Sequence, residues 1–590
     1  MNKENAWRFA LLGIVFVLVG FLILGKMMSF QLDPKNRQQF VEEQERFSGG
    51  WHTVYPARGH IMDRWGHLLA GNITMYEVGV NVDQVKNPHT IALTLNVILG
   101  LDYAKVREAI ENPAEGSVYI VLDDYVSKEN LERLKKYKEE IQTTYGGIEG
   151  KDAPSLDGLV WVSKLQRTYP EKSLASNILG FVGRDDEGKS KGYFGVEANY
   201  DDLLAGLPVT VWVPNDPNRV EKLPNVPEGT SLVLTIDLEI QRSMEEVVDA
   251  ALEETGAKSA TIVVLDPKTG EILAMATTPR LDLNKYWNYS NVFKDNTPFN
   301  RAISEAYEPG SVYKVLTMAA ALDKGVVKPD TEFIDTGKIE VGGAEIYNWN
   351  LGVWGPQTML GCMQHSLNVC LAWTATQLGA KDFYAYMKAF GIGHLTGVDM
   401  AGEVAGRLKV PGDTDWYDAE LGTNSFGQGV AATPLQMITA ISAVANNGKM
   451  MYPHIVRSII SNGHQYDTEP RVLSIPISVQ TAVTLSDMLA ESLEKEASDA
   501  LVEGYRVAGK TGTGEIPTPY GYTSDVTNTS FVGWGPVDDP RFVVYIWLEK
   551  PLTSIWGSEV AAPIFPRIVN KLVVLMNIPP DKVRHQLYGQ

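Results

Sequence analysis

The chain has 590 residues, of which 44% are hydrophobic and 9% aromatic, as in globular proteins, and its length calls for two or more domains. With 72 acidic against 52 basic residues, the net charge of −20 argues against a nucleic-acid partner, because phosphate binding needs a basic face. We interpret the charge as favouring solubility. The nine histidines show no metal-ligand spacing, so neither a metal nor another cofactor is expected.

An apolar segment lies near the start of the chain. Residues 9–25 are almost wholly apolar, and the run continues past Lys26 through Met27, Met28 and Phe30. This length approaches the roughly 20 residues that span a bilayer. No small-residue cleavage site follows, so the segment is predicted to be an uncleaved anchor. Basic residues lie on both sides of it, so the positive-inside rule does not decide its orientation.

The region from about residue 49 to residue 229 mixes short strand patterns with a few helices, and a polar stalk at 31–44 precedes it. Residues 75–82 alternate in the way expected of a half-buried strand, and 126–141 indicate a charged amphipathic helix. This region contains no nucleophile and base pair. Four prolines within 213–228 indicate a linker.

The remaining sequence predicts strands at both ends of a domain with helices between them. Strands are expected at 231–237, 261–266, 272–276, 506–513, 530–535 and 541–548. Helices are expected at 238–253, after Thr433 with Pro434 in the first position, at 478–495, and near Leu575. This order predicts an α+β domain in which helices pack on an antiparallel sheet.

The strongest chemical signal surrounds Ser311. Pro309 and Gly310 form a turn before an apolar, helix-forming run, so Ser311 is expected in the first turn of a buried helix. Lys314 follows three residues later and shares its face of the helix. A hydroxyl and an amine so placed are a candidate nucleophile and base. The N–H groups at the start of the helix suit a developing oxyanion.

Two further motifs follow, and two of the three motifs, Ser-x-x-Lys and Lys-Thr-Gly, have a duplicate elsewhere in the chain. Ser366-Leu367-Asn368 opens a second helix-like run, and Lys510-Thr511-Gly512-Thr513 follows a strand of small residues. A second Ser-x-x-Lys, ending at Lys495, lies in a charged run and is interpreted as a solvated helix surface paired with acids such as Glu491. A second Lys-Thr-Gly, beginning at Lys268, is interpreted as a hairpin turn.

The two cysteines, Cys362 and Cys370, are expected on or beside one helix. Eight helical residues rise about 12 Å, which exceeds the ~7 Å between Cα atoms that a disulfide can bridge. No disulfide is therefore predicted, and both cysteines are interpreted as small buried apolar groups.

The order of Ser-x-x-Lys, Ser-x-Asn and Lys-Thr-Gly resembles that of the serine penicillin-recognising enzymes. Segments 58–66, 167–170 and 192–206 resemble boxes of the non-catalytic module of class B penicillin-binding proteins, and 300–302 and 425–429 also fit this family. The resemblance implies a short cytoplasmic tail and transmembrane anchor (1–30), a stalk and elongated dimerisation-like pedestal (31–229), a transpeptidase domain of the penicilloyl-serine transferase fold (230–580) and a tail (581–590). No further C-terminal module is expected.

The pedestal carries a charged group that has two interpretations. Arg58, Asp63 and Arg64 either form a buried ion-pair joint that holds the pedestal to the catalytic domain, or lie in turns on the surface. The resemblance favours the joint.

The resemblance also implies the chemistry. Ser311 attacks the carbonyl between two D-alanines of a peptidoglycan stem peptide, and a neutral Lys314 takes its proton. We expect the charge of Lys510 to supply most of the required fall in the pKa of Lys314, with burial helping. Ser366 relays a proton to the departing amine, and the N–H groups of Ser311 and Thr513 form the oxyanion hole.

Substrate contacts follow from the same motifs. The amide of Asn368 is expected to bind the stem-peptide backbone. The hydroxyls of Thr511 and Thr513 are expected to bind the terminal carboxylate, and Gly512 lets a ligand approach the strand.

The predicted function is a peptidoglycan D,D-transpeptidase, inhibited by β-lactams and anchored in the plasma membrane with its catalytic domain outside. The Glu308-Pro309-Gly310 lead-in resembles division-type members, which suggests septal synthesis. An elongation-type transpeptidase, a D,D-carboxypeptidase or β-lactam-hydrolysing enzyme of the same fold, and a non-catalytic scaffold are the alternatives. Expected partners are stem peptides, lipid-linked nascent glycan strands and a polytopic membrane glycosyltransferase.

Overall fold

The computed structural model describes residues 6–32, 50–114, 116–148, 150, 153–213, 226–496, 498–518 and 521–588. The chain divides into two compact units, Met1–Ala57 with Ala205–Gly229, and Arg58–Leu204 with Thr230–Gln590. Nearly all of the stalk predicted at 31–44, and most of the linker predicted at 213–228, fall outside the described residues.

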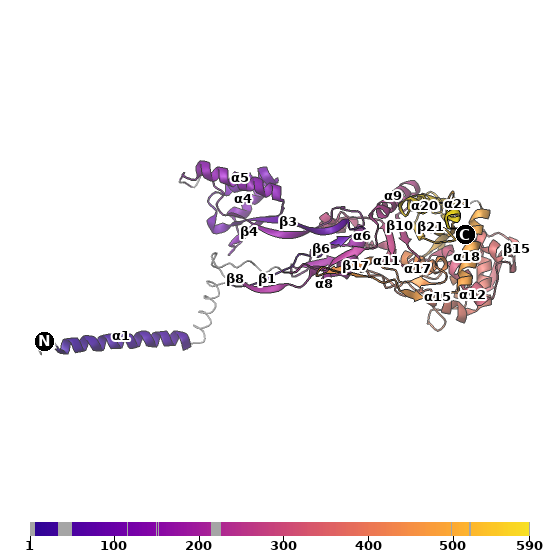
Figure 1. Cartoon of the computed structure of the whole chain (residues 1–590), viewed down its shortest axis with the longest axis horizontal. Coiled ribbons are helices and arrows are strands. Elements are labelled where there is room, and N and C mark those ends of the chain that lie inside the picture. Colours follow the sequence, from indigo (N-terminus) through magenta and orange to yellow (C-terminus); the bar gives the residue numbers. More distant parts are fainter. Residues whose placement is uncertain are drawn as a thin grey trace. The chain divides into compact units, whose positions relative to one another are not determined.

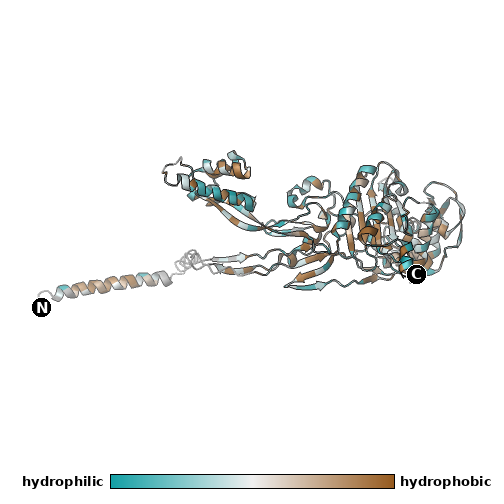
Figure 2. Cartoon of the chain, turned by 45° about the horizontal axis from the view of Figure 1, so that its top comes forward, coloured by the Kyte–Doolittle hydropathy of each residue, from teal (hydrophilic) through white to brown (hydrophobic). Residues whose placement is uncertain are grey.

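The first unit contains helix α1 (Ala6–Leu32) and a two-stranded antiparallel ribbon of β1 (Gly50–Val54) and β8 (Val209–Val213). Figure 2 shows the length of α1 as predominantly hydrophobic. Its residues Ala10–Ser29 form the one helical segment in the described part of the chain that is long and apolar enough to cross a membrane. The length and composition of this helix agree with the predicted span.

In the second unit, a long sheet joins the N-terminal boxes to the catalytic part of the chain. The strand order is β18-β17-β9-β2-β3-β4, and β5 also pairs with β3. Strand β2 pairs in parallel with β9, Ile61 facing Leu232. The strands are β2 (Ile61–Met62), β3 (Leu68–Asn81), β4 (Tyr119–Val126), β5 (Leu159–Thr168), β9 (Ser231–Leu234), β17 (Val456–Ser461) and β18 (His464–Asp467).

Helices α3 (Pro88–Leu99), α4 (Tyr103–Glu111) and α5 (Lys128–Tyr145) form a separate core with the inner face of β3. Val78 and Val80 point into this core, which confirms the alternation predicted for this strand. Helix α5 begins two residues later than predicted because the side chain of Ser127 caps it, accepting a hydrogen bond from the N–H of Asn130.

Short elements follow in the pedestal: α6 (Ser176–Leu179), β6 (Phe181–Arg184), β7 (Ser190–Tyr193), α7 (Gly195–Asn199) and α8 (Asp201–Ala205). The carboxylate of Glu197 is fully buried among them and accepts hydrogen bonds from Arg58 and Arg167, both at 2.7 Å. Arg58 also pairs with Asp201 at 2.7 Å. Buried charges of this kind are stable only when they are paired.

The predicted charged joint is present in part. Asp63 is fully buried, and its carboxylate accepts hydrogen bonds from the backbone of Trp65 and from that of Leu238, the first residue of α9 (Leu238–Thr255). Arg64 pairs with Glu271 of a catalytic hairpin at 3.2 Å. The contacts of Arg58 stay within the pedestal boxes, so Asp63 and Arg64 make the connection.

The catalytic domain is built on a five-stranded antiparallel sheet of order β11-β10-β22-β21-β20. Its strands are β10 (Ser259–Leu265), β11 (Ile272–Thr277), β20 (Ala508–Thr518), β21 (Gly521–Gly535) and β22 (Phe542–Glu549). Helices α9 (Leu238–Thr255) and α20 (Ile564–Leu575) pack on one face, and α17 (Pro434–Ala445) packs on the other (Figure 1). The predicted sheet with its covering helices is confirmed.

Local signals explain several of these boundaries. The side chain of Thr433 accepts a hydrogen bond from the N–H of Gln436, whose own side chain accepts one from the Thr433 N–H, and Pro434 follows at the first position. Ser478 caps α18 (Val479–Lys495) in a similar way, accepting from the N–H of Thr481. Both helices therefore begin where the sequence predicted.

The other elements of the second unit are η1 (Val82–Gln84), η3 (Leu283–Asn288), α10 (Tyr289–Val292), α11 (Arg301–Ser304), η4 (Gly310–Tyr313), α12 (Lys314–Lys324), β12 (Glu332–Asp335), β13 (Lys338–Val341), β14 (Ala344–Tyr347), β15 (Gly355–Thr358), α13 (Met359–Gln364), α14 (Asn368–Leu378), α15 (Ala380–Ala389), α16 (Glu420–Asn424), β16 (Met450–Met451), β19 (Val472–Ser474), α19 (Gly557–Val560) and α21 (Asp581–Tyr588). Helix α12 lies in the largest core and is buried over most of its length.

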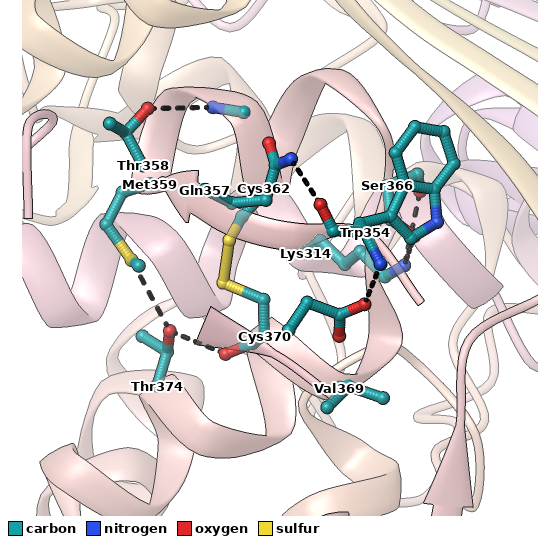
Figure 3. The surroundings of a disulfide bond; sticks show 12 residues. Lys314, Trp354, Gln357, Thr358, Met359, Cys362, Ser366, Val369, Cys370 and Thr374 are labelled. Atoms are coloured by element: carbon teal, nitrogen blue, oxygen red, sulfur yellow. Dashed lines mark hydrogen bonds between the residues drawn. A yellow bond between two sulfur atoms is a disulfide. The ribbon is translucent and has the colours of Figure 1, made fainter. Parts of the chain in front are cut away.

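The expectation for the cysteines was wrong. Cys362 and Cys370 form a disulfide, with their Cα atoms 6.0 Å apart and both residues fully buried (Figure 3). They do not share a helix, because α13 ends at Gln364 and the chain turns through Ser366, whose φ of +53° lies in the left-handed region, before α14 begins. This reversal brings the two cysteines within bonding reach.

Candidate active site

Ser311 lies in the short 3-10 turn η4, immediately before the buried helix α12. Gly310 in this turn has a φ of +59°, and a Cβ atom there would overlap the backbone of Thr513 on β20. Only glycine allows this close approach, which sets the turn directly against the strand carrying the Lys-Thr-Gly motif. The position predicted for Ser311, in the first turn leading into a buried helix, is confirmed.

Lys314 is the first residue of α12 and is fully buried. Its Nζ donates hydrogen bonds to the carbonyl of Ser366 at 2.6 Å, to Oδ1 of Asn368 at 2.7 Å and to Oγ of Ser366 at 3.2 Å. The contact with Ser366 is drawn in Figure 3. Lys314 therefore connects the nucleophile helix to the Ser-x-Asn motif.

Burial lowers the pKa of Lys314 well below its ordinary value, and the positive charge of Lys510 lowers this pKa further. The expected order of causes was therefore reversed, since burial contributes more than Lys510. All three hydrogen-bond partners of Lys314 are uncharged, so no carboxylate offsets the cost of burying its ammonium form.

Ser366 lies in the reversal between α13 and α14, and Asn368 is the first residue of α14. The amide Nδ2 of Asn368 donates to the carbonyl of Tyr347 at 3.1 Å, while its Oδ1 accepts from Lys314. Asn368 thus positions the amine, a role beyond the substrate contact predicted for it. The buried side chain of Asn348 also holds this segment, because its Oδ1 accepts from the N–H of Val369 at 3.2 Å.

The Lys-Thr-Gly motif lies on the edge strand β20, where Lys510, Thr511 and Gly512 face 532, 531 and 530 of β21. Burial lowers the pKa of Lys510 to about 8, and the negative charge of Glu496 opposes this shift. Nζ of Lys510 donates to Oγ1 of Thr511 at 3.2 Å.

Thr513 is held by a backbone group of the neighbouring helix α19. The N–H of Gly557, at the start of α19, donates to Oγ1 of Thr513 at 3.1 Å. The hydroxyl hydrogen of Thr513 remains available to a ligand, because the hydroxyl uses only an acceptor site in this bond.

These motifs surround a cleft of about 870 Å³. Ser311, Ser366, Asn368, Thr511 and Thr513 line it directly. Lys314, Lys510 and Gly512 lie behind these residues and contact them or their neighbours. The structure therefore brings all eight predicted site residues together, as a hydroxyl, a buried amine, a second hydroxyl and a second amine suited to nucleophilic acyl transfer.

Other cleft residues were not predicted from the sequence. Trp349 and Trp556 meet edge to face with their ring centroids 5.1 Å apart. His365 and Glu496 also line the cleft, with Nδ1 of His365 3.4 Å from Oε1 of Glu496. In the sequence, His365 could have been placed in the cleft because it is next to Ser366. Glu496 could not, because it ends a charged run that was interpreted as solvent-exposed.

The duplicate motifs lie elsewhere, as predicted. Lys495 pairs with Glu491 at 2.7 Å, one turn earlier on α18, and both side chains are about half exposed. Lys268, with the Thr-Gly that follows it, lies in the turn between β10 and β11 and pairs with Asp539. Among the described residues, no cluster of three or more His, Cys, Asp or Glu side chains is arranged to hold a metal ion.

Comparison with known families gives two matches along the chain. Residues 260–570 match the family described as penicillin binding protein transpeptidase domain, and residues 53–216 match the penicillin-binding protein dimerisation domain. Stage V sporulation protein D of Bacillus subtilis is 32% identical over 544 residues, covering 89% of this chain and 79% of that protein. Peptidoglycan D,D-transpeptidase FtsI of Escherichia coli K12 is 27% identical over 594 residues, covering 98% and 93%.

Solved structures agree. Penicillin binding protein 3 of Mycobacterium tuberculosis in complex with aztreonam aligns with a TM-score of 0.66 and 26% identity, covering 90% of this chain and 98% of that one. Its ampicillin complex aligns equally well, with 0.66 and 26% over 90% and 97%. The fold and the cleft are those of a serine transpeptidase of the penicillin-binding type. The chain belongs to this family, as a class B member in which a dimerisation domain precedes the transpeptidase domain.

Proposed function

We propose that this chain cross-links peptidoglycan stem peptides as a serine D,D-transpeptidase, with Ser311 as its nucleophile. The observation that carries the proposal is a fully buried Lys314 with a depressed pKa, joined by hydrogen bonds to Ser366 and placed three residues after Ser311. A lysine is a base only when it is uncharged, and this environment favours the uncharged amine.

Acylation follows from these positions. Oγ of Ser311 attacks the carbonyl carbon of the penultimate D-alanine while Nζ of Lys314 accepts the hydroxyl proton. The N–H groups of Ser311 and Thr513 stabilise the resulting oxyanion. The C–N bond then breaks, and the hydroxyl of Ser366 passes a proton from Lys314 to the leaving D-alanine nitrogen. The acyl group remains on Ser311 as an ester.

The second half of the reaction reverses these proton movements. The amine of an acceptor peptide attacks the ester carbonyl and loses a proton through Ser366 to Lys314. The ester C–O bond breaks, and Oγ of Ser311 regains a proton.

Before acylation, the terminal carboxylate of the donor peptide is bound by Thr511, Thr513 and the ammonium of Lys510, since hydroxyls and a cation on one strand suit a carboxylate.

Two of the similar solved structures are complexes with aztreonam and ampicillin, which supports β-lactams as inhibitors of this chain. We expect the ring carbonyl of a β-lactam to acylate Ser311 in place of the stem peptide. An ester that survives for minutes or longer would separate a transpeptidase from a β-lactam-hydrolysing enzyme of the same fold.

The proposed cellular role is septal cell-wall synthesis, and the similarity to FtsI over nearly the whole chain supports it. A second candidate is synthesis during sporulation, because the match to stage V sporulation protein D shows the higher identity, 32% against 27%. Depleting the protein in growing cells distinguishes the two roles. Filamentation supports septal synthesis, whereas normal division with defective spores supports the second.

The apolar helix α1 supports a membrane anchor with the catalytic domain on the outer side of the plasma membrane, where stem peptides are cross-linked. Lipid-linked nascent glycan strands would then reach the cleft, and a polytopic glycosyltransferase in the same membrane is the proposed partner. We also propose that the pedestal ends at residue 229 and that the transpeptidase domain begins at residue 230.

The nucleophile is tested by treating the detergent-solubilised full chain with penicillin and locating the adduct by mass spectrometry. We expect the adduct on Ser311 and its loss in Ser311→Ala. Ser492→Ala is the matched control, because Ser492 belongs to the other Ser-x-x-Lys sequence, and it should label normally. Labelling that persists in Ser311→Ala would overturn the proposal.

A further inference from the structure

The two lysines of the cleft differ in their charged surroundings. Lys314 has uncharged hydrogen-bond partners, and the charged group that acts on it is Lys510. Lys510 has a carboxylate within electrostatic reach, that of Glu496. Because an opposite charge favours the charged form, Glu496 favours the ammonium form of Lys510, and no carboxylate among the described residues does the same for Lys314.

Glu496 follows the last turn of α18, a helix that packs against both α13 and β20. Its carboxylate lines the cleft together with His365, and Oε1 lies 3.4 Å from Nδ1 of that histidine. The imidazole of His365 stacks on Trp354 with ring centroids 4.3 Å apart. Nε1 of Trp349 donates to the His365 carbonyl at 3.1 Å. Glu496 is thus held against a fixed neighbour at the edge of the site.

The other charged groups of α18 are committed elsewhere. Glu491 pairs with Lys495 at 2.7 Å, while Asp487 and Glu494 both pair with Arg506. Across the cleft, Glu515 of β20 accepts a hydrogen bond from the amide of Gln428. His365 and Lys510 are the groups on the neighbouring elements that act on Glu496.

This arrangement decides which of the two lysines is charged. Two buried ammonium groups repel each other, so the cleft favours the state in which only one of Lys314 and Lys510 is an ammonium group and the other is a neutral amine. The negative charge of Glu496 stabilises the ammonium form of Lys510. Lys314 is then left as the free amine, and the charged Lys510 remains available to a substrate carboxylate.

Resting on the function proposed above, we propose that Glu496 is a positioning residue that keeps Lys510 protonated and so sets the alkaline end of the enzyme's working pH range. It acts through Lys510 and need not touch the substrate. Burial alone brings the pKa of Lys510 down, and Glu496 limits that fall. Removing the carboxylate therefore lowers the pKa of Lys510, whereas Lys314 keeps its environment as long as Lys510 is charged.

The test is the pH dependence of the second-order rate of acylation by a fluorescent penicillin, measured for the full chain between about pH 6 and about pH 10. In Glu496→Gln we expect the alkaline limb to move down by about half to one pH unit, because Glu496 is partly exposed and its effect is screened. The rate above about pH 8 then falls about 3- to 10-fold. The acid limb stays in place.

Two variants complete the experiment. Glu496→Asp retains the carboxylate and should return the alkaline limb towards its wild-type position. Glu491→Gln removes the same charge from the same helix at a residue paired with Lys495, and should leave the profile unchanged.

An alkaline limb that does not move in Glu496→Gln overturns the inference, as does a rate lowered by the same factor at every pH, which indicates general damage. Failure of the proposed function looks different. In that case wild-type protein would carry its adduct at a residue other than Ser311, whatever the behaviour of Glu496→Gln.

Discussion

Lys314 shows how burial can turn an ordinary side chain into a base. Its amine lies in a fully buried position, and its hydrogen-bond partners are the neutral oxygens of Ser366 and Asn368. Burial disfavours the ammonium form, so the pKa falls and the free amine is present at a lower pH than in solvent. The acylation rate should therefore rise with pH through an acid limb set by Lys314.

Replacing this base gives the first prediction at the residue scale. Lys314→Gln cannot accept a proton, so acylation by penicillin should slow by about 100- to 10,000-fold, and the acid limb should vanish from the residual rate. Stopped-flow fluorescence across the pH range measures both effects. Lys495→Gln removes the lysine of the duplicate motif and should behave as wild type. An acid limb that persists in Lys314→Gln would assign it to another group.

Gly512 gives the second prediction. A Cβ atom there would overlap Oγ of Ser530 and come within 2.9 Å of Val312, next to the nucleophile. Gly512→Ala should push β20 away from the Ser311 turn, slow acylation and lower the free energy of unfolding by about 1–3 kcal/mol. Gly147→Ala is the control, because no atom lies within 4 Å of its added Cβ. Urea unfolding and acylation kinetics are the measurements, and equal behaviour of the two variants would contradict the expected crowding.

At the scale of elements, the reversal between α13 and α14 holds Ser366 in place. The disulfide closes the loop from Cys362 to Cys370, which contains both Ser366 and Asn368. Outside the loop, the side chain of Asn348 accepts a hydrogen bond from the N–H of Val369 and donates one to the carboxylate of buried Asp335 at 2.9 Å. The segment is therefore fixed from two sides, which keeps the hydroxyl of Ser366 against Lys314.

Removing the cross-link gives the prediction at this scale. The double variant Cys362→Ala, Cys370→Ala should lower the free energy of unfolding by about 2–3 kcal/mol, because the unfolded chain regains the freedom of a short loop. Acylation should also slow as the Ser366 turn loosens. Urea titration checks the stability. Wild-type protein treated with a dithiol reductant should approach the variant, and an unchanged denaturation midpoint in both would show that the disulfide contributes no stability.

At the scale of the whole molecule, buried charges connect segments distant in sequence. Glu197 binds Arg58 and Arg167, which are 139 and 30 residues away from it. Asp63 and Arg64 extend this connection to the catalytic domain. These pairs fix how the pedestal boxes meet within the second unit, and they lie apart from the residues that line the cleft.

Glu197→Gln should therefore damage stability more than chemistry. It leaves the nearly buried Arg167 without a carboxylate partner and Arg58 with Asp201 alone, and we expect a loss of about 3–5 kcal/mol in the free energy of unfolding. The acylation rate of protein that remains folded should be close to wild type. Glu132→Gln removes an exposed carboxylate paired with Lys135 and should leave the free energy of unfolding nearly unchanged, because solvent screens such a pair. Comparable losses in the two variants would show that burial of the Glu197 pairs is unimportant.

The sequence by itself determined the features that depend on local patterns. The long apolar helix, the antiparallel sheet, the Thr433 and Ser478 helix starts and the separation of true motifs from their duplicates all follow from periodicity, capping and composition near each residue. The eight site residues could be named because each motif carries its own chemistry within a few positions.

Only the tertiary structure decided what depends on residues far apart. It placed Glu496 in the cleft, where its charge acts on Lys510, brought the amide of Asn368 to Lys314 and made burial, more than Lys510, the main cause of the depressed pKa of Lys314. It also joined Cys362 to Cys370, because the chain reverses through the left-handed residue Ser366 between α13 and α14. Burial and electrostatic fields are sums over the surrounding fold, and a sequence pattern does not contain them.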